Sequence, residues 1–178
     1  SEDMIRLARA RIPEGEFVQG SVLDAKLPEC VAVAAVGEVF NYAFDERAGL
    51  QAFAHTMKSI FEALVPGGIF LFDIAGPGRA GDAPRMGFVD HDDWSIVHRA
   101  AEHGDTLTRD ITTFTQNGNF YRRNDERHVL RLYRPSEVLD ALTAAGFTTT
   151  QLDGYADFNL PVGWHAFLAR KPLAYPSS

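Results

Sequence analysis

Two apolar runs without alternation predict two strands in the first half of the chain. Residues Val31–Val36 read VAVAAV and Ile69–Phe72 read IFLF, and turn-forming residues follow or precede each run. Strands that are covered on both faces show such runs, which are typical of parallel sheets flanked by helices. Between them, apolar residues recur at helical spacing over Leu50–Leu64, which predicts a helix that Asp45 caps and Pro66 ends.

The first twenty residues predict a capped helix and a short strand. Ser1 can cap a helix that runs to Arg11, because acidic residues fill its first turn and Met4, Ile5 and Ala8 form an apolar stripe. Pro13 and Gly15 end this helix. Residues Glu16–Gln19 then predict a short strand that ends at Gly20.

The pattern changes to β-type after Arg79. Gly81–Asp93 is polar and irregular and predicts a loop. Antiparallel strands are then expected at Trp94–Ala101, Thr106–Thr115 and Asn119–Tyr133, with the Asn117-Gly118 pair as a strong hairpin signal. A helix over Pro135–Ala145 and two paired strands, Phe147–Tyr155 and Trp164–Lys171, complete the chain.

These elements predict one α/β domain over residues 1–178 with an inserted antiparallel β-subdomain at 94–133. A net charge of −7 argues against a general nucleic-acid binder. The single Cys30 excludes a disulfide framework and a cysteine-rich metal site, and the aspartates around His91 fit no standard metal site. With no signal-peptide pattern and no apolar run that could span a membrane, we expect a cytoplasmic protein.

Four segments occur in the order and spacing of a known family. SEDMIRLARAR, FVQGSVLD, VAVAAVGEVFNY and LVPGGIFLFDIAGPGR together resemble the class I S-adenosylmethionine-dependent methyltransferases. The later ERHVLRLYRPSEVLDALTAAGF and WHAFLARKP fit the small-molecule branch of that family. The resemblance implies a Rossmann-like fold, S-adenosylmethionine as cofactor, and methyl transfer to a nitrogen, oxygen or carboxylate of a small molecule.

The resemblance also implies the cofactor residues. In the family, the strand that ends at Gly20 delivers an acidic residue and a backbone amide to the adenine ring, and here Ser21 and Val22 hold those places. Val36, Gly37 and Glu38 would line the methionine part of the cofactor, with Gly37 leaving room for close approach.

One departure from the family pattern concerns the start of the chain. The family's first strand, its glycine-rich loop and the acidic residue for the ribose lie upstream of the SEDM helix. We therefore expect the carboxyl-terminal three-quarters of a methyltransferase. The missing strand belongs between the strands ending near Gly20 and Val36, so these would pair directly or expose their edges, and self-association is expected.

The acceptor side is also predicted by position. Methyl transfer is mainly a matter of orientation, and a general base helps where the nucleophile must lose a proton. We expect Tyr42 and His128 as catalytic residues. The residues expected to contact the substrate are Asn41, Asp73, Arg79, Trp94, Arg131 and Tyr133.

Several alternatives stay open at this point. Arg79, Arg109, Arg122 and Arg131 could bind an anionic substrate or pair with the chain's excess carboxylates. His91, His98 and His103 are expected at the surface. A non-catalytic methyltransferase-like domain that acts in assembly is the main functional alternative. A nucleotide-binding oxidoreductase is a weaker one, because the chain lacks the G-x-G-x-x-G fingerprint.

Overall fold

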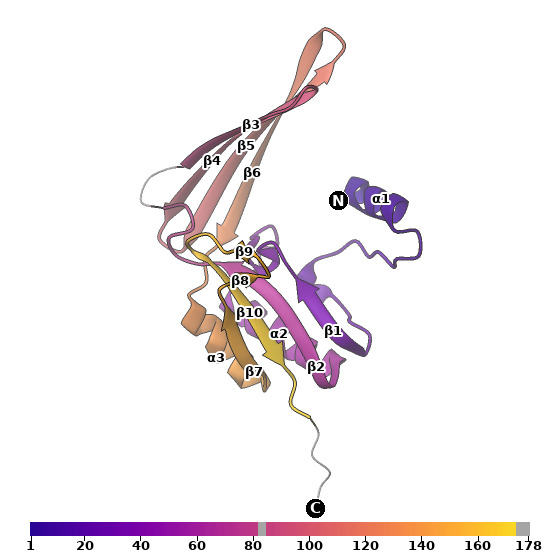
Figure 1. Ribbon diagram of the computed structural model, residues 1–178, viewed down its shortest axis with the longest axis vertical. Helices are drawn as coiled ribbons and strands as arrows, with labels where there is room; N and C mark the ends of the chain where they lie inside the picture. Colours follow the sequence, from indigo (N-terminus) through magenta and orange to yellow (C-terminus); the bar gives the residue numbers. More distant parts are fainter. Residues whose placement is uncertain (82–84, 174–178) are drawn as a thin grey trace, which may run out of the picture.

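The computed structural model describes residues 1–81 and 85–173. It consists of a core sheet in the order β1-β2-β10-β7 and an inserted sheet in the order β3-β4-β5-β6 (Figure 1). The helices are α1 (Glu2–Arg11), α2 (Leu50–Ala63) and α3 (Pro135–Ala145), with short 3-10 helices η1 (Val22–Asp24) and η2 (Val39–Asn41). The strands are β1 (Cys30–Ala35), β2 (Leu64–Ala75), β3 (Arg85–Asp90), β4 (Trp94–His103), β5 (Thr106–Asn117), β6 (Phe120–Arg131), β7 (Thr148–Leu152), β8 (Gly154–Tyr155), β9 (Phe158–Asn159) and β10 (Trp164–Arg170).

The core sheet is mixed, and its buried face packs on α2 and α3 (Figure 1). Strand β1 is parallel to β2, whereas β10 is antiparallel to both β2 and β7. Phe70, Phe72 and Phe167 are completely buried on the helix side. Ile69 and Leu71, which alternate with the phenylalanines, are only half-buried. The predicted cover on both faces is therefore partial: on the face away from the helices Asp73 and Ala75 are buried, whereas Ile69 and Leu71 stay partly exposed.

Strand β2 begins directly after α2, and the Pro66-Gly67-Gly68 segment lies inside it. Gly67 has a φ of 81°, and the pairing register with β1 shifts across this segment. The Lys171 ammonium donates hydrogen bonds to the carbonyls of Phe61 and Leu64 at 2.8 and 2.6 Å. Because the last carbonyls of a helix lack partners within it, this lysine caps the end of α2.

The start of α2 differs from the prediction. The helix begins at Leu50 with Gly49 as its N-cap, and Asp45 lies in the preceding loop with its carboxylate turned to other partners. The apolar stripe of the helix is confirmed, since Phe53, Met57 and Ile60 are buried.

The amino-terminal segment makes little contact with the core. Helix α1 is capped by Ser1 as predicted, but none of its residues is buried, and it lies apart from the core sheet (Figure 1). The strand predicted at Glu16–Gln19 does not form. Among the described residues, β1 therefore pairs only with β2, and Val31 on it is 71% exposed. The sequence left two alternatives for this sheet, direct pairing of the strands near Gly20 and Val36 or exposed strand edges. The structure shows an exposed edge at β1.

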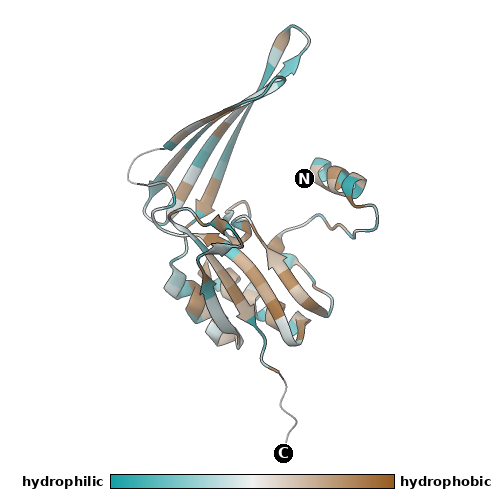
Figure 2. Ribbon diagram, in the orientation of Figure 1, coloured by the Kyte–Doolittle hydropathy of each residue, from teal (hydrophilic) through white to brown (hydrophobic). Residues whose placement is uncertain are grey.

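The inserted sheet has four described strands rather than three. Strand β3 forms within the segment predicted as a loop, of which residues 82–84 lie outside the described residues. The sheet extends away from the core, and its strands mix hydrophilic and hydrophobic positions along their length (Figures 1 and 2). Near its base, Leu107, Leu130 and Leu132 pack with Ala75 and Ala80 in a second small core, which attaches the insertion to the end of β2.

The carboxyl-terminal predictions are mostly confirmed. Helix α3 ends at Gly146, which has a φ of 102°, and β7 pairs with β10. The small β8-β9 hairpin between them was not predicted. No helix among the described residues is long and apolar enough to cross a membrane.

Candidate active site

A buried carboxylate organises the carboxyl end of the core sheet. Asp73 on β2 is completely buried and accepts hydrogen bonds from the backbone N–H groups of Gly37 and Glu38, which follow β1. It also accepts a bond of 2.9 Å from the Tyr155 hydroxyl. Gly37 and Glu38 have φ angles of 97° and 61°, in the left-handed region that is unfavourable for glutamate. Asp73 therefore holds the sharp turn after β1 in place.

The side chain of Glu38 joins three segments of the chain. It is 4% exposed and pairs with Nε of Arg79 at 2.6 Å and with Nη2 of Arg109 at 2.7 Å. Arg79 follows β2 and Arg109 lies on β5, so one carboxylate connects the turn after β1, the loop after β2 and the inserted sheet. The guanidinium of Arg79 also lies 4.8 Å from the centroid of the Trp164 ring.

These residues surround a cleft of about 360 Å³ between the core sheet and the base of the insertion, which we call the junction cleft. It is lined by Gly37, Glu38, Tyr42, Arg79, Arg85, His98, Ala100, Leu107, Arg109 and Trp164. The strand register explains how the insertion supplies them. Arg85, Ala100 and Arg109 are directly paired across β3, β4 and β5, so their side chains share one face of the sheet.

His98 belongs to the next row of that face, opposite Gly87 on β3. A Cβ atom at Gly87 would lie only 2.0 Å from Cε1 of His98. The imidazole therefore occupies the space that any other residue at position 87 would fill, which is a common reason for glycine within a strand. The prediction that His98 is a surface residue is wrong, because its half-buried ring lines the cleft.

A second and more open cleft, which we call the outer cleft, has a volume of about 1000 Å³. It is lined by Gly20, Ser21, Val22, Val39, Tyr42, Phe44, Asp45, Glu46, Arg47 and His128. The ring of His128 meets the rings of Tyr42 and Phe44 edge-on at 5.7 and 5.6 Å, so the two predicted catalytic residues lie together. Tyr42 lines both clefts and marks where they meet.

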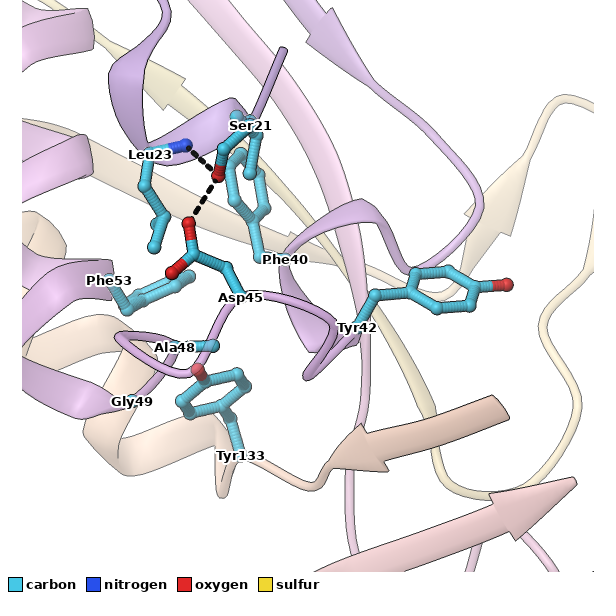
Figure 3. A pocket seen from close by; sticks show the side chains of 10 residues that line it. Ser21, Leu23, Phe40, Tyr42, Asp45, Ala48, Gly49, Phe53 and Tyr133 are labelled. Atoms are coloured by element: carbon cyan, nitrogen blue, oxygen red, sulfur yellow. Dashed lines mark hydrogen bonds between the residues drawn. The ribbon is translucent and has the colours of Figure 1, made fainter. Parts of the chain in front are cut away.

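Ser21 and Asp45 form one polar unit beside this cleft (Figure 3). The Ser21 hydroxyl donates to Oδ2 of Asp45 at 2.8 Å and accepts from the Leu23 N–H. The Arg47 guanidinium beside Asp45 holds the pKa of that carboxyl well below its usual range, and the Ser21 hydrogen bond lowers the pKa further. A carboxylate thus accompanies Ser21, the residue predicted to contact the adenine, although it comes from a different segment.

A small cavity of about 30 Å³ lies behind this pair (Figure 3). Tyr133 points into it from the segment after β6, and its ring packs 5.0 Å from that of Phe53. Tyr133 is 1% exposed, and burial raises the pKa of its phenol. The cavity has room for about one water molecule.

The structure separates the predicted residues into three groups. The predicted cofactor residues divide between the two clefts, with Gly20, Ser21 and Val22 on the outer cleft and Gly37 and Glu38 on the junction cleft, while Val36 is 55% exposed and lines neither. Of the predicted substrate residues, only Arg79 lines the junction cleft.

The other predicted substrate residues have different surroundings. The amide of Asn41 is completely buried and bonds the backbone of Ala75 and the Arg131 carbonyl, so it ties η2 to β2 and β6. Trp94 stacks on His91 at 4.2 Å, and Arg131 lies over the Tyr133 ring at 5.6 Å. Asn41, Asp73 and Tyr133 are buried, and neither Trp94 nor Arg131 lines a described cleft, so direct substrate contact by these five stays a prediction.

Sequence reasoning did not select Arg85, Asp45 or Trp164 for the site. Strand register could have indicated Arg85, because β3 places it level with Arg109 across the sheet. The sequence was interpreted as a loop there, so this register was not considered. Asp45 was interpreted as a helix cap, and only tertiary contact brings it to Ser21. Trp164 starts β10, where the period-two pattern gives no hint that an arginine from another loop lies over its ring.

Comparisons with known proteins identify the fold. No family model matches the chain. In sequence, it is 34% identical over 96 residues to YqeM of Bacillus subtilis, a protein provisionally named a methyltransferase, and the match covers 52% of this chain and 39% of YqeM. In structure, it matches an S-adenosylmethionine-dependent methyltransferase from Clostridium acetobutylicum with a TM-score of 0.82 at 18% identity, covering 97% of this chain and 72% of the other.

Two further solved structures agree with this result. DesVI of Streptomyces venezuelae has a TM-score of 0.78 at 23% identity, covering 98% of this chain and 72% of DesVI. The sugar N-methyltransferase KedS8 of Streptoalloteichus has a TM-score of 0.77 at 20% identity, covering 97% of this chain and 68% of KedS8. The chain therefore has the Rossmann-like fold of the class I S-adenosylmethionine-dependent methyltransferases.

Proposed function

We propose that this protein transfers the methyl group of S-adenosylmethionine to a small-molecule acceptor. One observation carries the proposal: the residues expected for the cofactor and those able to hold an acceptor line two clefts that meet at Tyr42. The related sugar N-methyltransferase KedS8 and the amino pentose methyltransferase CalS10 act on small molecules, which supports the acceptor class. Cytoplasmic location and self-association stay predictions.

The residues present fit part of the cofactor. Gly37 has a φ of 97°, and no atom lies within 4 Å of where its Cβ would be, so the backbone leaves open space beside the cleft. Gly37 would hold the methionine part of the cofactor, and Ser21 and Val22 would hold its adenine. When bound, S-adenosylmethionine supplies an electrophilic methyl group on a positively charged sulfur.

The chain's own residues then position the acceptor and accept its proton. Asp73 fixes the turn at Gly37 and Glu38. This turn would contact both the cofactor and the acceptor, and its rigidity would hold the two in a fixed orientation. The His128 ring lies edge-on to the Tyr42 ring with 5.7 Å between the centroids, and its Nε2 lies 3.3 Å from Oε2 of Glu126, which orients the imidazole. An acceptor amine or hydroxyl that enters beside Tyr42 can thus pass its proton to His128.

Calorimetric titration with S-adenosylhomocysteine tests the proposed function. We expect the parent protein to bind the compound and Gly37→Val to lose binding, because the new side chain fills the space at the cofactor. The matched control is Gly118→Val. Gly118 also has a positive φ, of 62°, and open space at Cβ, but it lies in the β5-β6 turn. Binding that is equally weakened in both variants, or unchanged in Gly37→Val, would contradict the cofactor assignment.

A further inference from the structure

The lining of the junction cleft has an excess of positive charge. Arg79, Arg85 and Arg109 face it, whereas Glu38 is the only carboxylate among its lining residues. Asp73 lies behind Glu38, but its oxygens are already bonded to two backbone N–H groups and the Tyr155 hydroxyl. Glu102 is on the same face of the insertion, but its oxygens accept from the backbone N–H groups of Gly78 and Ala80. The side chains that line the cleft thus carry three positive charges against one negative charge, in a protein of net charge −7.

The arginines on the outer face of the same sheet are different. Arg127 pairs with Asp110 at 2.6 Å and Arg123 with Asp125 at 2.9 Å, each on the face opposite to Arg109. These exposed arginines are thus matched by aspartates in number. Arg79 and Arg109 of the cleft, in contrast, share the single carboxylate of Glu38.

Glu38 positions two of the cleft arginines without using all their donors. It engages Nε of Arg79 and Nη2 of Arg109, and a guanidinium carries five N–H donors. Their side chains are 16% and 21% exposed, so the guanidinium groups are held in place but still accessible from the cleft. Arg85 lines the cleft from β3 with an exposed side chain, and the ion pairs of the described residues do not include it.

We propose that the junction cleft binds an anionic group of the methyl acceptor, a carboxylate or a phosphate. Guanidinium groups present paired donors that match these oxyanions, and hydrogen bonds between charged partners are the stronger ones. His98, seated against Gly87, adds a ring nitrogen to the same wall. That the anion belongs to the acceptor rests on the proposed function, whereas the anion site itself stands on this geometry alone.

Trp164 provides a direct readout of occupancy. Its ring lies beneath the Arg79 guanidinium, so an anion that reaches Arg79 changes the surroundings of the indole. The chain contains one other tryptophan, Trp94, and a Trp94→Phe background isolates the fluorescence of Trp164. Sodium phosphate is titrated into this protein at constant ionic strength, with sodium chloride as the reference salt. A parallel titration with succinate distinguishes carboxylate from phosphate preference.

We expect a saturable fluorescence change, and we expect Arg85→Gln to weaken phosphate binding about tenfold, as the loss of one charge-assisted hydrogen bond predicts. The matched control is Arg99→Gln. Arg99 is exposed on β4 beside His98 but on the opposite face of the sheet, and we expect a change below about twofold there. Equal weakening in both variants, or no saturable signal in the parent, would overturn the proposal.

Titration with S-adenosylhomocysteine is run on the same proteins, so that the two proposals fail separately. Phosphate binding without cofactor binding would leave the anion site standing and remove the methyltransferase proposal. Cofactor binding without phosphate binding would leave the methyltransferase proposal standing and remove the anion site, because the cleft would then be specific for a neutral or cationic acceptor.

Discussion

The two sheets of this protein differ in what holds them together. In the core sheet, the Phe72 ring stacks on Phe70 at 4.4 Å and on Phe167 at 5.3 Å between centroids, under two helices. The inserted sheet has buried leucines only at its base, and Phe120 near its tip is 79% exposed. Beyond the base, backbone hydrogen bonds connect its strands. Its exposed ion pairs, Arg127 with Asp110 and Arg123 with Asp125, contribute little to stability.

The residues that stabilise the fold are therefore not the residues that line the clefts. Burial of aromatic surface in the core sheet supplies the free energy that the fold needs. Charged side chains of the insertion lie where the two sheets meet, and Glu38 and Asp73 connect them to the core. The binding clefts thus lie at the boundary, where a stable sheet supports polar groups whose burial is costly without partners.

Substitution of a core phenylalanine should have the largest effect on stability. Phe72→Ala removes a ring that contacts Phe40, Phe70 and Phe167, and we expect a loss of about 3–5 kcal/mol in the free energy of unfolding. Phe120→Ala makes the same chemical change in the inserted sheet, and we expect a change within about 0.5 kcal/mol. Urea denaturation of both variants measures the contrast. Similar losses would show that the tip of the insertion is packed in solution.

The sequence predicted the local elements of both sheets better than the contacts between distant segments. Apolar runs and helical periodicity located β1, α2 and β2, and the Asn117-Gly118 pair located the β5-β6 hairpin, because these signals depend on local geometry and on burial. The partial exposure of Ile69 and Leu71 on β2 was missed, since an apolar run does not show how much of each face is covered. Contacts such as Ser21 with Asp45, or Glu38 with Arg109, join residues from distant segments, and no local pattern encodes them.

Asp73→Asn should have an intermediate effect, because it weakens the connection between the core and the clefts. The carboxylate accepts from Gly37, Glu38 and Tyr155, whereas an amide offers one acceptor oxygen and turns an NH₂ group toward donors. We expect a loss of about 1–3 kcal/mol in the free energy of unfolding together with weaker S-adenosylhomocysteine binding. Asp125→Asn on the inserted sheet is the control. An unchanged cofactor affinity in Asp73→Asn would show that the turn does not depend on this carboxylate.

The smallest expected effect concerns Tyr155, which touches the same carboxylate from the β8-β9 hairpin. Burial raises the pKa of the Tyr155 phenol, and the hydrogen bond to Asp73 raises it further. Above the ordinary phenol pKa of about 10, the unfolded chain loses this proton while the folded protein keeps it. The folded state then binds more protons than the unfolded state, so the contribution of Tyr155 to stability is constant below about pH 10 and falls as the pH rises above it.

Tyr155→Phe should therefore reduce the slope with which the free energy of unfolding falls above about pH 10. Tyr133, whose phenol pKa burial also raises, supplies the remainder, so the slope becomes shallower without vanishing. Tyr121→Phe makes the same chemical change at a residue that is 60% exposed on the insertion, and it serves as the control. Urea midpoints measured between pH 8 and 11 compare the three proteins. If Tyr155→Phe kept the parental slope, the phenol would be as free in the folded protein as in the unfolded chain, and Asp73 would hold the turn after β1 without a partner from the carboxyl-terminal hairpin.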